Sequence, residues 1–185
     1  MRTICAAAVI ALLAQQKNAN PDLKYDEAAG ISIGKAPKND EWAFRDKGFF
    51  EKTKVCVSHK VDYIAVDVIQ VPPAPNTSGW DLKKQADADF SGFSAGVGVT
   101  EMKKVSQQDK AKLPGGGAGG AAGTYLEMTF KRAEKPVEYR YWNFVGKQNG
   151  CLYLVILHGD EGMYKKHQKI ADYVVSTIQT WKLPK

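Results

Sequence analysis

The sequence is poor in histidine and cysteine, and it has no apolar run long enough to cross a membrane. Three histidines in 185 residues provide little material for a metal centre. Outside the N-terminal segment only Cys56 and Cys151 remain, which excludes more than one disulfide. These two cysteines form a bridge if their strands are neighbours, and otherwise they are buried thiols. The apolar run from Ile4 to Ala14 is shorter than the roughly 20 residues that a spanning helix needs.

Arginine is also scarce, although the chain is basic. The net charge is +6, and 22 of the 26 basic residues are lysines spread along the chain. An excess of positive charge suits an anionic partner, whereas nucleic-acid readout usually relies on arginine and interleaved aromatic residues. We therefore expect a protein partner or an anionic ligand, whose identity stays open, and no nucleic acid. We also expect a monomer.

The N-terminal segment resembles a secretory signal peptide. A basic start at Met1-Arg2-Thr3 precedes the apolar run, which ends on the small residue Ala14. We predict a signal peptide over residues 1–14, a linker over 15–24 and a single α+β domain over 25–185. The protein is then exported, to the periplasm or beyond. If residues 1–14 instead form a buried helix, the protein is cytoplasmic.

The last sixty residues predict three strands followed by one helix. The strands Thr124–Lys131, Val137–Val145 and Cys151–His158 are rich in aromatic and β-branched residues. Asn149-Gly150 supplies the positive-φ positions of a tight antiparallel connection, so the strands form a β-meander. The run Leu152–Leu157 is apolar at every position, and large groups occupy both faces of the middle strand. Helices must therefore cover both faces of the sheet.

Two amphipathic helices can supply these layers. Apolar residues recur at spacings of three and four over Gly162–Trp181 and, less regularly, over Trp80–Phe93. Pro114–Gly123 reads as a flexible loop. Further strands are predicted at residues 31–33, 42–44, 55–59, 62–71 and 97–105. The fold class is α+β, with a mainly antiparallel sheet sandwiched between helices in a three-layer α/β/α arrangement that ends in the meander and a C-terminal amphipathic helix.

This order of elements resembles the PsbP-like family and its Mog-type relatives. The similarity is strongest at Gly123–Leu126, Arg140–Val145, Asn149–Leu154 and Tyr164–His167, and it returns near Tyr25–Lys35. The resemblance implies an antiparallel sheet between helices. Members of the family are associated with calcium or manganese in photosynthetic water oxidation, but no ligand motif of the family can be matched here residue by residue.

One motif suggests a serine hydrolase. Gly92-Phe93-Ser94-Ala95-Gly96 matches G-x-S-x-G, and Asp160 and His167 follow in the order of a catalytic triad. That motif needs a strand before the serine and a helix after it, whereas here a helix precedes and a strand follows. We interpret the motif as a glycine-rich helix terminus.

Two other patterns suggest ligands. His158, Asp160 and His167 lie around a strand-to-helix junction and could bind zinc or manganese. With so few histidines, we instead interpret Asp160 as a helix cap and expect no metal. Gly115–Gly120 satisfies G-x-G-x-x-G, but a strand follows where phosphate binding needs a helix, so we expect no nucleotide or other cofactor.

The sequence thus favours a non-catalytic, exported binding or accessory protein of PsbP-like architecture. Two alternatives stay open. One is a small serine hydrolase that uses Ser94, and the other is an intracellular protein-interaction module, as in Mog-type Ran binding.

Overall fold

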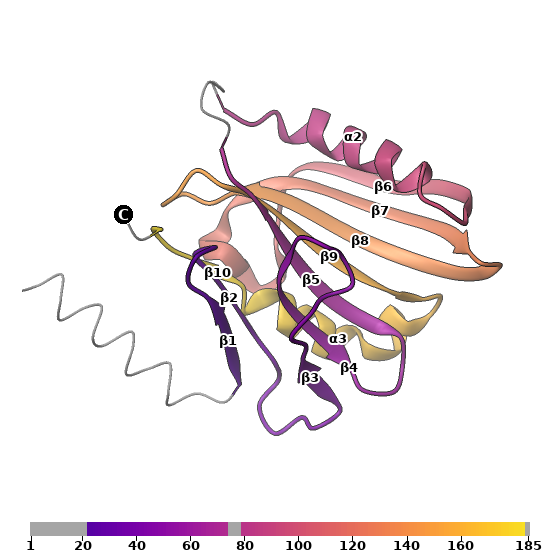
Figure 1. Cartoon of the computed structure of the whole chain (residues 1–185), viewed down its shortest axis with the longest axis horizontal. Coiled ribbons are helices and arrows are strands. Elements are labelled where there is room, and N and C mark those ends of the chain that lie inside the picture. Colours follow the sequence, from indigo (N-terminus) through magenta and orange to yellow (C-terminus); the bar gives the residue numbers. More distant parts are fainter. Residues whose placement is uncertain (1–21, 74–78, 184–185) are drawn as a thin grey trace, which may run out of the picture.

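In the computed structural model, which describes residues 22–73 and 79–183, helices lie on opposite sides of a seven-stranded sheet (Figure 1). A second, three-stranded sheet lies beside it. The elements in chain order are β1 (Leu23–Asp26), β2 (Ile31–Gly34), β3 (Trp42–Phe44), β4 (Thr53–His59), β5 (Ile64–Val71), α2 (Leu82–Ser94), β6 (Val99–Lys112), η1 (Pro114–Gly120), β7 (Ala122–Arg132), β8 (Lys135–Val145), β9 (Leu152–Asp160), α3 (Met163–Ser176) and β10 (Gln179–Thr180).

The large sheet is antiparallel and has the strand order β3-β4-β5-β9-β8-β7-β6. The predicted meander is confirmed, since β7 pairs with β8 and β8 pairs with β9. Gly150 has a φ of +69° in the connection between β8 and β9, but Asn149 does not have a positive φ, and the connection spans residues 146–151, so it is longer than the predicted tight turn. The small sheet has the order β1-β2-β10 and joins the two ends of the described chain.

Each face of the large sheet has its own hydrophobic core. Helix α2 packs on β6, β7 and β8, and helix α3 packs on β5, β9 and η1. Leu126, Tyr141 and Ile156 belong to the core under α2, whereas Trp142 and Val155 belong to the core under α3. The alternation along β8 and β9 thus fills both cores. The predicted three-layer α+β fold is confirmed.

A buried polar network ties α2 to the sheet. The Tyr141 hydroxyl donates to Asp89 of α2, and Asn143 Nδ2 donates to Leu82 O at 2.7 Å. Asn143 Oδ1 accepts from Thr124 N at 2.9 Å. Burial raises the pKa of Asp89 above its usual value. The network fixes the position of the helix along β7 and β8.

The C-terminal helix is shorter than predicted. It ends at Ser176, because Thr177 Oγ1 donates to Val174 O at 2.6 Å and accepts from Gly34 N at 2.7 Å. The following residues form β10 and pair with β2. The prediction that the helix reaches Trp181 is therefore wrong. Its N-cap is Gly162, and Asp160 ends β9 instead of capping the helix.

Two other segments also differ from their predictions. Strand β6 extends to Lys112 and has three register shifts along β7. The segment Pro114–Gly120 packs against α3: Gly117 and Ala118 are buried, and Ala118 N donates to Ile178 O. It is a packed turn and not a free loop.

The two cysteines are free and buried. Cys56 lies on β4 and Cys151 immediately precedes β9, and β5 separates these strands. A disulfide is therefore excluded by the topology, and the reading as buried thiols is confirmed. Burial raises the pKa of both thiols, which makes them poor nucleophiles.

Candidate functional site

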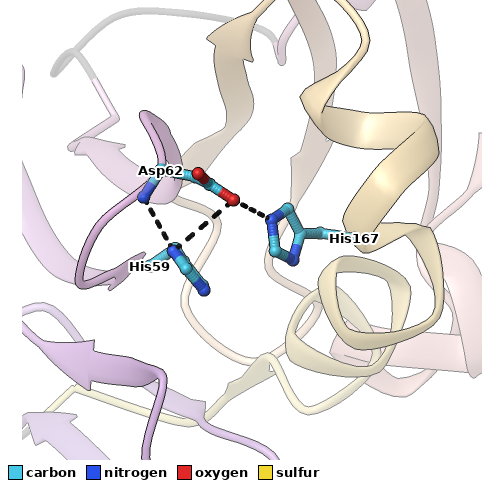
Figure 2. Close-up of side chains that lie close together, drawn as sticks. All are labelled: His59, Asp62 and His167. Carbon is cyan, nitrogen blue, oxygen red and sulfur yellow. Dashed lines mark hydrogen bonds and ion pairs between the residues drawn. The ribbon is translucent and has the colours of Figure 1, made fainter.

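His59, Asp62 and His167 form a compact cluster between the end of β4 and helix α3 (Figure 2). Asp62 lies in the turn after β4, and its Oδ2 accepts a hydrogen bond from His167 Nε2 at 2.6 Å. The same oxygen lies 3.9 Å from His59 Nδ1. The centroids of the two imidazole rings lie 4.5 Å apart, and the ring planes are tilted by 43°. The cluster therefore joins segments that are 105 residues apart in the chain.

Charged side chains lie next to this cluster on two sides. Lys166 Nζ donates to Asp62 Oδ2 at 2.7 Å, and this bond, followed by that from His167, lowers the pKa of Asp62 to about 2. The carboxyl is therefore ionised at neutral pH. Glu41 Oε2 lies 3.9 Å from His59 Nε2, on the other side of the ring.

The backbone also fixes the His59 ring. Its Nδ1 accepts from the amides of Asp62 and Val61, at 2.9 and 3.3 Å, so the neutral ring carries its proton on Nε2. The ring of Trp42 packs edge-on against both His59 and His167, with centroid distances of 5.8 and 6.0 Å. Packing and hydrogen bonds thus hold the cluster in one arrangement.

The donor atoms of the cluster decide which ions suit it. Two imidazoles and one carboxylate are the ligands of zinc and similar first-row metals. Calcium takes six to eight oxygen ligands, and manganese also prefers oxygen. The calcium implied by the resemblance to the PsbP-like family therefore does not fit this cluster, and manganese fits it less well than zinc.

A second histidine–carboxylate pair lies on the opposite face of the sheet. His158 Nε2 is 2.8 Å from Asp67 Oδ2, and both side chains are fully buried. Asp67 Oδ1 accepts from Phe49 N at 3.0 Å and from Thr53 Oγ1 at 2.8 Å. The pair thus fastens the loop between β3 and β4 to the sheet.

Aromatic rings enclose His158. The rings of Phe49, Phe50, Tyr63 and Tyr139 lie 5.0 to 5.6 Å from it, centroid to centroid. Its Nδ1 has no hydrogen-bond partner within the described part of the chain. This enclosure shields the pair from solvent and makes it a structural element of the fold.

A basic hollow of about 430 Å³ opens at the end of the large sheet where β3 lies. Helix α2 covers β6 to β8 and leaves this end open. Three cationic side chains and one carboxylate line it, and its floor includes the buried Ser58. Its lining residues are Ala43, Phe44, Arg45, Asp46, Lys47, Ser58 and Lys60.

The structure does not bring together Ser94, Asp160 and His167. Ser94 ends α2, on one face of the sheet, and its hydroxyl donates to Ser91 O at 2.8 Å. His167 lies on α3, on the other face, and pairs with Asp62. Asp160 ends β9. The three side chains are not arranged as a triad.

The set His158, Asp160 and His167 is separated in the same way. His158 points to the α2 side, next to Tyr139, whereas His167 lies on α3. Sequence reasoning did not find His59 or Asp62 as partners of His167. The available signal was the pattern His-x-x-Asp across a strand end and the turn that follows it.

Solved structures of other proteins share this architecture, and three of them illustrate it. Cyanobacterial PsbP (CyanoP) from Synechocystis superposes with a TM-score of 0.53 at 14% identity, over 86% of this chain and 91% of that protein. LpqN of Mycobacterium tuberculosis, which is described as involved in cell envelope biogenesis, gives 0.52 at 12% identity, over 89% and 95%. A Bacteroides thetaiotaomicron protein gives 0.53 at 13% identity, over 87% of this chain and 48% of that one.

The chain has a PsbP-like fold. No protein-family model matches its sequence, and no curated protein matches it either. At these identities the likeness concerns the PsbP-like fold alone, because one fold hosts unrelated functions. Within the described residues, no helix is long and apolar enough to cross a membrane.

Proposed function

We propose that this PsbP-like chain is a non-catalytic, exported binding or accessory protein that binds an anionic group in the basic hollow. The observation that carries the proposal is the convergence of Arg45, Lys47 and Lys60 on an open part of the sheet. The hollow is shallow and open to solvent, which suits a small charged group better than a large apolar ligand. The dispersal of Ser94, Asp160 and His167 supports binding over catalysis.

Arg45 is the best-placed ligand-binding residue of the hollow. Its Nη1 donates to Ser58 Oγ at 3.3 Å, and its guanidinium lies 4.9 Å from the ring centre of Phe49. These contacts orient the planar group and leave other donors for a carboxylate or phosphate. Asp46, the one acidic lining residue, lies 3.6 Å from Lys24 Nζ, which offsets its charge.

Inorganic phosphate and citrate are suitable probes of this site. We expect saturable chemical-shift changes confined to the amides of residues 43–47 and 58–60 in the labelled protein. Replacement of Arg45 by glutamine should weaken binding about tenfold, because a charge-assisted contact is lost. Lys169→Gln is the matched control, since it removes one charge from an exposed position on α3. No binding, or equal weakening in both variants, would contradict the proposal.

Export is the second part of the proposal and rests on residues 1–14, which lie outside the described residues. We expect N-terminal sequencing of the protein recovered from its native host to begin at Gln15, after removal of the leader. An intact Met1 would remove export and favour the alternative of an intracellular interaction module.

A further inference from the structure

We propose that His59, Asp62 and His167 form a binding site for one divalent first-row transition ion of the Zn²⁺ type. The inference is independent of the basic hollow, because it concerns other residues. The side chains supply two nitrogen donors and one oxygen donor, and these atoms all lie within 4.8 Å of one another. Three protein ligands with water in the remaining position form a recognised zinc arrangement.

The cluster is also accessible. The side chains of His59, Asp62 and His167 are 7%, 21% and 11% exposed, so an ion can enter without unfolding of the protein. The Glu41 carboxylate lies 3.9 Å from His59 Nε2, beyond hydrogen-bond distance, so it acts on the ring only through its charge.

Lys166 occupies the position that a metal would take at the carboxylate. Its Nζ lies 2.7 Å from Asp62 Oδ2, but its side chain is 58% exposed and can move into solvent. A bound ion would replace this ammonium as the counter-charge of Asp62. Lys166 is therefore a competitor of the metal and not a ligand.

Metal binding by His59 would also cost hydrogen bonds. Coordination through Nδ1 requires the ring to give up the two hydrogen bonds from the amides of Val61 and Asp62. The turn after β4 must then adjust, while β4 itself stays paired with β5. We therefore expect modest affinity, and a larger effect from loss of Asp62 or His167 than from loss of His59.

Calorimetric titration with ZnCl₂ tests the site in the full chain. We expect one ion per molecule in the wild type, and weakening of more than about 10-fold in His167→Gln and Asp62→Asn, because loss of a ligand should exceed loss of an outer-shell contact. Thermal unfolding of each variant without metal checks that it is folded. Wild-type affinity in both folded variants, or no zinc binding by the wild type, would overturn the proposal.

Lys166→Gln gives the sharper test, because all three donors remain. Removal of the competing ammonium should tighten zinc binding severalfold. Lys165→Gln is the control, since it removes the same charge one position earlier, from an exposed side chain. Equal tightening in both variants, or none in Lys166→Gln, would contradict a metal placed on Asp62. Quenching of Trp42 fluorescence by Ni²⁺, abolished in Trp42→Phe, provides a local readout of the same site.

Discussion

Replacement of Asp67 by alanine is expected to lower the free energy of unfolding by about 3–5 kcal/mol. The carboxylate is fully buried and accepts from Phe49 N, from Thr53 Oγ1 and from the ring of His158. Without Asp67 the buried ring of His158 and the part-buried donors of Phe49 and Thr53 lose their partner, and the loop between β3 and β4 loses its anchor. Urea unfolding followed by circular dichroism measures the change.

A double-mutant cycle tests whether the pair itself causes this loss. His158→Ala alone should also be strongly destabilising, while Asp67→Ala and His158→Ala together should cost less than the sum of the single changes. Asp109→Ala is a control, because its nearest cation, Lys83, lies 3.9 Å away at an exposed position; its cost should be below about 1 kcal/mol. Additive losses, or a small effect of Asp67→Ala, would contradict the pairing.

Gly123→Ala is expected to destabilise the protein by about 3 kcal/mol, at the upper end of the range for overpacking. Gly123 lies opposite Phe144 in the β7–β8 ladder. A Cβ atom at this position would lie 1.6 Å from the backbone oxygen of Asn143, so two paired strands would have to separate. Because the neighbouring atom belongs to the backbone, no side-chain rotation can relieve the clash. Chemical denaturation measures the loss.

The same substitution at Gly92 should have the opposite sign. Gly92 lies inside α2, it is exposed, and a Cβ atom there would meet nothing within 4 Å. Gly92→Ala should therefore stabilise the protein by about 0.5–1 kcal/mol, because alanine favours the helix. Destabilisation by Gly92→Ala, or tolerance of Gly123→Ala, would contradict the structure at these positions.

The sequence predicted the three-layer arrangement of the fold more accurately than the residues at which the helices and strands end. Apolar groups on both faces of β8 and β9 indicated covering helices, and α2 and α3 supply them. The apolar spacing of α3 continues through Ile178 and Trp181, so the pattern alone did not show that Thr177 ends the helix. Strands β1 and β10 have four and two residues, too few for a local pattern, and β10 pairs with β2 from the other end of the described chain.

The candidate metal site was beyond sequence reasoning for a physical reason. Strand alternation directs Leu157 to the α3 core, and therefore directs His158 to the opposite face. A pairing of His158 with His167 across the junction is thus impossible, although they lie close in the sequence. The actual partners of His167 come from the end of β4, and only the packing of α3 on the sheet brings them together.

The lysines on the long edge strand β6 have a second physical effect. An unpaired edge strand of fourteen residues can form hydrogen bonds with the edge strand of another molecule. Such pairing is a common first step of aggregation. Four exposed lysines, Lys103, Lys104, Lys110 and Lys112, line this strand, and its three register shifts break its regularity. Part of the positive charge therefore disfavours pairing of this edge with a second strand.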